Sequence, residues 1–109
     1  MPRFSDVVNG VSQAGQNVGT GAVVSFDATP LANRVLVMII NRGSGDIQVQ
    51  MRAVGTTAPA TGDFGANDGD LVVPAGDFRS IPATGGIQFH ALSASGTNDI
   101  SFIQFSNQP

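Results

Sequence analysis

Five residue types are missing from this chain of 109 residues: lysine, glutamate, cysteine, tryptophan and tyrosine. Lysine and glutamate usually cover the solvent face of helices. Every charge here is instead Arg or Asp, and Asp is a poor helix former that favours turns. Without cysteine, disulfide scaffolds and thiolate metal sites are excluded, so the fold must rest on packing and hydrogen bonds. The absence of Trp and Tyr also removes the rings on which most sugar-binding sites depend.

The charge and the hydropathy pattern argue against two classes of partner. Five Arg oppose eight Asp for a formal net charge of −3, and no basic patch is available for nucleic acid. The longest apolar run, 35–40, is far shorter than the stretch of about 20 residues that spans a membrane. Residues 1–6 lack the apolar core of a signal peptide. We therefore expect one domain made in a cytoplasm, with neither nucleic acid nor a membrane as partner.

What the chain does contain is a series of short strands separated by Gly- and Pro-rich turns. Residues 46–54 (DIQVQMRAV) alternate, with Ile47, Val49, Met51 and Ala53 on the inner face. Residues 34–41 (RVLVMIIN) are apolar on both faces, which is typical of a strand buried on both sides. These two runs predict a β-hairpin closed by a loop of four or five residues.

Similar runs occur at 22–27 (AVVSFD) and, in the second half, at 71–73, 78–82, 86–93 and 100–105. Strands spaced near ten residues apart, with turns between them, predict an all-β, single-domain β-sandwich or jelly-roll-like fold. We expect seven to eight short antiparallel strands, all within residues 20–109.

The first nineteen residues differ from this pattern. In 1–19, Val is scattered among Asn, Gln and Gly with no strand or helix period, which predicts an irregular N-terminal segment or an extended arm. We expect such an arm to dock on a partner or a neighbouring subunit, with Phe4 as its anchor.

The last strand is apolar on both faces, since Ile100 and Phe102 share one side while Ile103 and Phe105 share the other. Such a strand is either central in the sandwich or has one face covered by another subunit. The second alternative makes Ile103 and Phe105 candidate interface residues.

Few residues are suited to chemistry. His90 is the only histidine, and on its alternating strand it lies opposite Phe89, so we expect an exposed polar residue with no catalytic role. The loop 55–70 holds Asp63, Asp68 and Asp70, whose carboxylates are candidate ligands for a cation such as calcium. The spacing does not fit an EF-hand, and Asp with Gly is also the usual composition of a surface turn. We therefore expect no enzyme activity and no cofactor.

The second half of the chain resembles a known group of proteins. Its runs are 71–82 (LVVPAGDFRSIP), 86–91 (GIQFHA) and 95–102 (SGTNDISF). This succession is similar to that of small β-structured virion proteins of tailed bacteriophages, closest to capsid decoration (cement) proteins. The resemblance covers residues 70–105 and consists of strands and turns, with no functional residues to transfer.

The resemblance implies a catalytically inert virion structural protein that binds the major capsid protein on the outer capsid surface and stabilises it. It also implies a homo-oligomer, most often a trimer, assembled in the host cytoplasm. Two other functions stay open from the residues alone. One is a carbohydrate- or receptor-binding β-module of a phage tail or fibre, and the other is a small hydrolase that would depend on an Asp or on His90.

Overall fold

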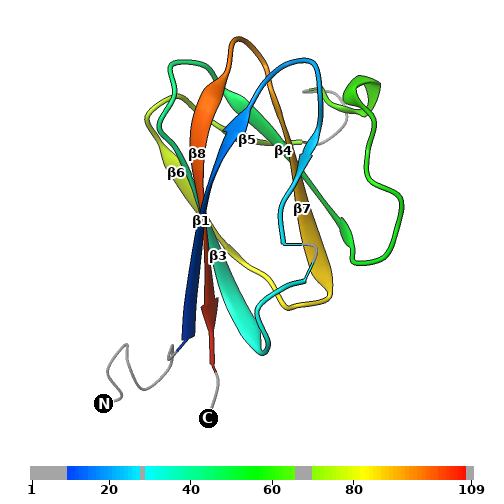
Figure 1. Cartoon of the computed structure of the whole chain (residues 1–109), viewed down its shortest axis with the longest axis vertical. Helices are drawn as coiled ribbons and strands as arrows, with labels where there is room; N and C mark the ends of the chain where they lie inside the picture. Colours follow the sequence, from blue (N-terminus) through cyan, green and yellow to red (C-terminus); the bar gives the residue numbers. More distant parts are fainter. Residues whose placement is uncertain (1–9, 28, 66–69, 108–109) are drawn as a thin grey trace.

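The computed structural model describes residues 10–27, 29–65 and 70–107, and its regular secondary structure is almost entirely β-strand (Figure 1). The strands are β1 (Gly10–Val18), β2 (Val24–Ser25), β3 (Arg34–Asn41), β4 (Ile47–Ala53), β5 (Leu71–Val73), β6 (Phe78–Pro82), β7 (Ile87–Ser93) and β8 (Asn98–Ser106). One short 3-10 helix, η1 (Thr61–Asp63), lies in the loop between β4 and β5. In the described part of the chain, no helix has the length and apolar composition needed to span a membrane.

The strands form two four-stranded antiparallel sheets packed face to face. Sheet A has the order β1-β8-β3-β6 and sheet B the order β2-β7-β4-β5. In Figure 1, sheet A stands on the left of the sandwich and sheet B on the right. Consecutive strands change sheet at every step except from β4 to β5 and so give a jelly roll. The predicted all-β sandwich of seven to eight strands is thereby confirmed.

The predicted hairpin of residues 34–54 is wrong, because β3 and β4 do not pair. β3 pairs with β6 and β8 in sheet A, and β4 pairs with β5 and β7 in sheet B. The short turn between them therefore carries the chain across the sandwich. The strands β7 and β8 are likewise consecutive but lie in different sheets.

The expected irregular segment is also corrected where the structure describes it. Gly10–Val18 form β1, which pairs with β8 over nine residues, from Gly10 opposite Ser106 to Val18 opposite Asn98. Val18 is fully buried in the core. The sandwich thus already includes Gly10–Val18, ahead of the predicted start at residue 20, because pairing along β8 orders a segment that has no hydrophobic period of its own. Residues 1–9, including Phe4, lie outside the described residues.

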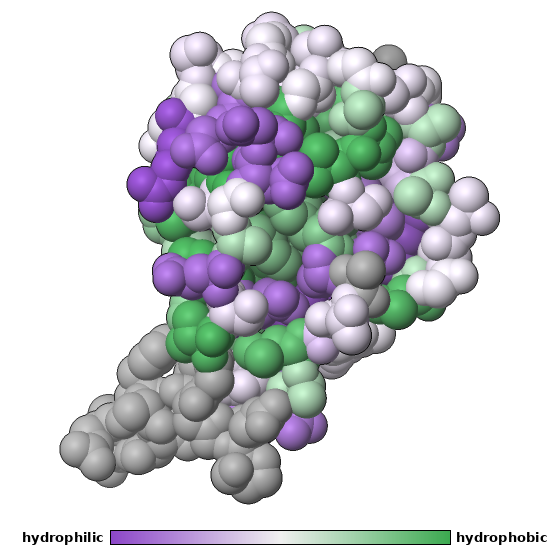
Figure 2. All heavy atoms as spheres, viewed as in Figure 1, coloured by the Kyte–Doolittle hydropathy of each residue, from purple (hydrophilic) through white to green (hydrophobic). Residues whose placement is uncertain are grey.

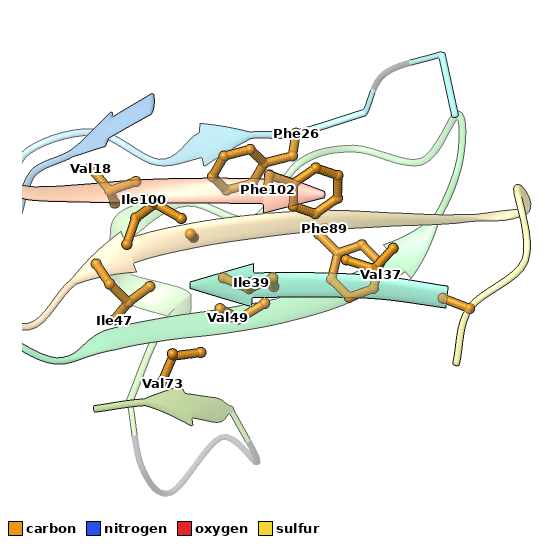
Figure 3. Close-up of a cluster of buried hydrophobic side chains, with 12 residues drawn as sticks. Val18, Phe26, Val37, Ile39, Ile47, Val49, Val73, Phe89, Ile100 and Phe102 are labelled. Carbon is orange, nitrogen blue, oxygen red and sulfur yellow. The ribbon is translucent and has the colours of Figure 1, made fainter. Parts of the chain in front are cut away.

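The core lies between the two sheets and contains three phenylalanine rings (Figure 3). Phe26 and Phe102 stack with ring centroids 4.8 Å apart, and Phe89 tilts against Phe102 at 5.6 Å. Aliphatic side chains from both sheets fill the rest: Val18, Val37, Ile39, Ile47, Val49, Val73 and Ile100. The alternation predicted for β4 places Ile47 and Val49 here, whereas Met51, which is 47% exposed, and Ala53 are exposed, so the predicted inner face is wrong for the second half of β4.

A buried ion pair closes one end of this core. The Nη1 atom of Arg34 contacts the Oδ2 atom of Asp27, and both side chains are 0% exposed. Arg34 also donates to the carbonyl of Ala83 at 3.3 Å and to Oε1 of Gln104 at 3.0 Å, and its guanidinium lies over the Phe89 ring. Burial raises the pKa of Asp27, and hydrogen bonds from Arg34 and from the Phe89 N–H oppose that shift. The positive charge of Arg34 therefore stabilises the ionised carboxylate of Asp27 in the protein interior.

Two buried asparagines hold together the turn that follows β3 and the turn that precedes β8, at one end of the sandwich. Asn41 donates from Nδ2 to the Gly45 carbonyl at 2.7 Å, while Asn98 Oδ1 accepts from the Gly45 N–H at 2.8 Å. Gly43 must lack a side chain here, because a Cβ on it would lie 2.0 Å from Asn98 Oδ1. These contacts lock the turn 42–46 against the turn before β8, which directs β3 and β4 into different sheets.

Candidate interaction surface

Apolar side chains gather on the outer side of sheet A, among the polar residues Gln13, Ser80 and Ser101, although the inner side of this sheet already forms half of the core. In the strand register, Phe105 lies opposite Val11 and Leu36, Ile103 lies opposite Met38, and Phe78 lies opposite Ile40. We call these seven residues the apolar face: Val11, Leu36, Met38, Ile40, Phe78, Ile103 and Phe105. They come from all four strands of the sheet, so the face extends across its width.

The apolar face remains substantially exposed to solvent. Val11 is 58% exposed and Phe78 is 53% exposed, while Leu36, Met38 and Ile40 are half-buried. On sheet B the corresponding outer residues of β4 are the polar Gln48, Gln50 and Arg52. Figure 2, which looks onto the side of the molecule where β1 and β2 lie, shows hydrophobic residues reaching the surface between hydrophilic ones. The two sheets therefore differ in chemistry on their outer sides.

The predicted interface residues are placed differently within this face. Phe105 is half-buried on the outer side of β8, as expected. Ile103 lies on the same side, but only 8% of it is exposed, because β8 is central and flanked by β1 and β3. The first alternative for the last strand is confirmed, since β8 is central and flanked by β1 and β3. That another subunit covers its outer side stays a prediction. Val11 and Phe78 are the most exposed members of that face, and they were missed because each is a single apolar residue in a polar context.

A shallow hollow adjoins the apolar face beside β1. It has a volume of about 220 Å³ and is lined by Gln13, Ala14, Gly15, Arg42, Ser101 and Ile103. A Cβ on Gly15 would meet no atom within 4 Å, so the absence of a side chain leaves this space open. Arg42 donates to Ser101 Oγ at 2.9 Å along its floor. The hollow is smaller than the roughly 300–1,000 Å³ of most ligand sites.

The acidic loop lies against sheet B and its carboxylates already have donors. Asp70 accepts from Gln50 Nε2 and from the Gly65 N–H, each at 2.8 Å. Asp63 accepts from the Ala60 N–H at 2.8 Å, and Asp68 lies outside the described residues. Among residues the structure describes, no group of three or more His, Cys, Asp or Glu is placed to hold a metal ion.

His90 is buried, which corrects the expectation of an exposed residue. It is 1% exposed although it lies on the outer side of β7, opposite Ser25 and Gln50. Gln50 donates to the Asp63 carbonyl at 2.5 Å and Arg52 donates to the Thr57 carbonyl at 3.1 Å. These bonds hold the loop between β4 and β5 over the outer side of sheet B, along the right of Figure 1. The sequence predicted that His90 lies on the outer side of its strand, but it did not predict that the loop between β4 and β5 covers that side.

The imidazole is not arranged as a general base. Ser25 Oγ lies 2.8 Å from His90 Nδ1, a distance suitable for a nucleophile and base pair. The Nε2 atom, however, is buried and has no hydrogen-bond partner in the described structure, so no carboxylate orients the ring. The ring therefore has a hydrogen-bond partner in Ser25 and lacks the carboxylate that orients the imidazole of a catalytic triad.

His90 should make the protein less stable in mild acid. Burial lowers the pKa of His90 below its usual value, and the positive charge of Arg52 lowers it further. Between that lowered pKa and the ordinary value of about 6.5, the unfolded chain binds a proton that the folded chain does not, so stability falls as pH decreases. We expect the urea midpoint to fall between pH 7.5 and pH 5.5 in the wild type, and to fall less in His90→Gln. Equal pH dependence in both proteins would contradict this account.

Comparisons with known proteins support the fold but show no family for this chain. No protein-family model and no curated protein matches the sequence. Among solved structures, Streptomyces albus HEPD with 2-hydroxyethylphosphonate and Fe(II) bound matches with a TM-score of 0.54 at 12% identity, over 90% of this chain and 18% of that one. The cupin domain of Drosophila melanogaster CENP-C matches with a TM-score of 0.51 at 14% identity, over 84% of this chain and 55% of that domain. PirA matches with a TM-score of 0.51 at 18% identity, over 85% of this chain and 92% of that one.

The chain therefore spans about half of the CENP-C domain and less than a fifth of HEPD. At such low identities the likeness concerns the backbone alone, and fold does not carry function with it. What the comparisons show is that this chain has a cupin- or jelly-roll-like β-sandwich fold.

Proposed function

We propose that this protein is a non-enzymatic virion structural protein, a capsid decoration protein that binds the outer surface of a major capsid protein through its apolar face. The single observation that carries the proposal is the apolar outer side of sheet A. In a two-sheet sandwich the inner sides supply the core and the outer sides are normally polar. An exposed apolar area of this kind is costly in water, and a partner that covers it removes the cost.

The border of the apolar face supports binding to a protein surface. At one end, Asn17 lies opposite Asp99, and the N–H of Arg42 donates to the Asp99 carbonyl at 2.8 Å. An apolar centre with a polar, charged border is the usual composition of a protein–protein interface. The resemblance of residues 70–105 to phage decoration proteins supports a capsid as the partner.

The same face is suited to self-association on the shell, and the proposal includes a homo-oligomer of three copies once the protein is bound to a capsid. Phe105 and Val11 are adjacent in the register and would lie at the contact. Ile103 contributes less than the sequence implied, because the chain itself already buries it. Light scattering at micromolar concentration, with and without capsids, measures the number of copies.

Co-sedimentation tests the capsid proposal. Shells assembled from the major capsid protein of the same genome should pellet the wild-type protein. Phe78→Asp and Met38→Asp should each weaken that binding by about tenfold or more, since each places a charge in the contact. Both positions are on the outer side of sheet A, so circular dichroism should stay unchanged. Gln48→Asp, on the outer side of sheet B, is the matched control and should bind like the wild type.

Two results would count against the proposal. One is a wild-type protein that does not pellet with the shells, and the other is equal binding by Phe78→Asp and Gln48→Asp. A receptor- or carbohydrate-binding module is the second candidate, because the hollow presents the polar groups of Gln13, Arg42 and Ser101. Binding on a glycan array that Arg42→Ala abolishes would favour that function instead.

A further inference from the structure

Strand β1 is an edge strand whose outer edge is open. It pairs with β8 on one side, and no backbone hydrogen bond among the described residues joins its other side to another segment. Six of its residues are exposed: Val11, Gln13, Ala14, Gly15, Gln16 and Asn17. An edge of this length offers a row of unpaired N–H and C=O groups to any strand that can approach it.

The other three edges of the sandwich are protected. β2 has two residues and β5 has three, which is too short to hold a partner strand. β6 contains Arg79 and ends at Pro82, a charge and a residue without an N–H. Charge, proline and shortness are the means by which sheet edges avoid pairing. β1 has nine residues and none of these protections.

The composition of β1 favours a second copy of the same chain. The protein carries a net charge of −3, yet residues 10–18 contain no charged side chain, so two copies can bring these strands together without repulsion. Most soluble homo-oligomers contain two-fold contacts, in which a surface meets its own copy. We propose that β1 pairs antiparallel with β1 of a second copy about a two-fold axis at Ala14, which joins two sheets A into one of eight strands.

This register is self-complementary on the outer side of the sheet. With Ala14 opposite the Ala14 of the other copy, Gln13 of each copy lies opposite Gly15 of the other. Gly15 has no side chain and borders the hollow over Ser101 and Arg42. The amide of Gln13 can therefore extend across Gly15 into the hollow of the other copy, where these polar groups are hydrogen-bond partners. The two-fold axis makes this contact twice.

On the inner side, the same register places Ser12 opposite Gln16 of the other copy. These are small or uncharged side chains that fit a closely spaced antiparallel pair. The inference does not depend on the capsid proposal, since it concerns the edge of the sheet rather than its apolar face.

Cysteine cross-linking tests the pairing and its register, because the natural chain has no cysteine. Residues directly opposite in antiparallel strands have Cα atoms about 4.5–5.5 Å apart, within the range a disulfide bridges. Ala14→Cys should form disulfide dimers on mild oxidation. Ser12→Cys and Gln16→Cys should each stay monomeric alone and link when mixed. Ser80→Cys, exposed on the protected edge β6, should not link.

A charge at the axis tests the association without a cross-link. Ala14→Lys places two like charges opposite each other and should convert dimers to monomers in analytical ultracentrifugation at micromolar concentration, with an unchanged circular dichroism spectrum. Ser80→Lys should leave the dimer intact. The proposal is overturned if the wild type sediments as a monomer, if Ala14→Lys retains the wild-type mass, or if Ser12→Cys alone links as readily as Ala14→Cys. Capsid binding by a monomeric wild type would leave the proposed function standing and remove this inference.

Discussion

Replacing Arg34 with Met should lower the free energy of unfolding by about 3–5 kcal/mol, because it leaves the carboxylate of Asp27 buried without its positive partner. The lost hydrogen bonds to the Ala83 carbonyl and to Gln104 add to the effect. In a domain of this size each kcal/mol corresponds to roughly 4–8 °C in melting temperature. Urea unfolding followed by circular dichroism measures the change.

A second substitution and a control separate charge from packing in that result. Asp27→Asn added to Arg34→Met removes the unpaired charge and should recover part of the lost stability. Arg79→Met breaks the exposed pair of Arg79 with Asp77, whose atoms are 2.9 Å apart, and should have little effect because solvent screens it. Comparable losses in Arg34→Met and Arg79→Met would show that the buried pair is not the cause.

Replacing Asn98 with Ala should cost about 2–3 kcal/mol, because buried donors and acceptors lose their partner. Asn98 donates to Ser93 Oγ at 2.7 Å and accepts from the Gly45 N–H at 2.8 Å, and it is 1% exposed. The substitution also loosens the two turns that carry the chain between the sheets, from β3 to β4 and from β7 to β8. The midpoint of urea unfolding should fall accordingly.

Asn17→Ala is the matched control for Asn98→Ala. Asn17 is exposed on β1, so its replacement should shift the midpoint only slightly. A small loss from Asn98→Ala, equal to that from Asn17→Ala, would mean that water replaces the turn contacts without cost.

The apolar pattern correctly placed apolar residues on both sides of two strands, and this is the basis of the candidate surface. The prediction that 34–41 is buried on both sides is wrong, because the outer side of β3 is half-buried. β3 and β8 are apolar on both faces, and the structure places one face of each in the core and the other on the outer side of sheet A. Exposure of Val11 and Phe78 could not be predicted, because an isolated apolar residue gains its neighbours only when strands from distant parts of the sequence pair. The residue set of the surface therefore depends on the register of β1 and β6.

The sequence by itself determined the all-β class, the positions of most strands and the inward side of β7 and of the first half of β4. A two-residue period and turn-forming residues are local properties, and they suffice for these features. The two-residue period does not specify which strands pair with one another. A short turn such as 42–46 closes a hairpin or crosses to the other sheet with the same residues, and the buried contacts of Asn98 decide between them. Only the tertiary structure buried His90 beneath a loop, paired Arg34 with Asp27 and ordered β1 along β8, because each requires residues distant in sequence to meet.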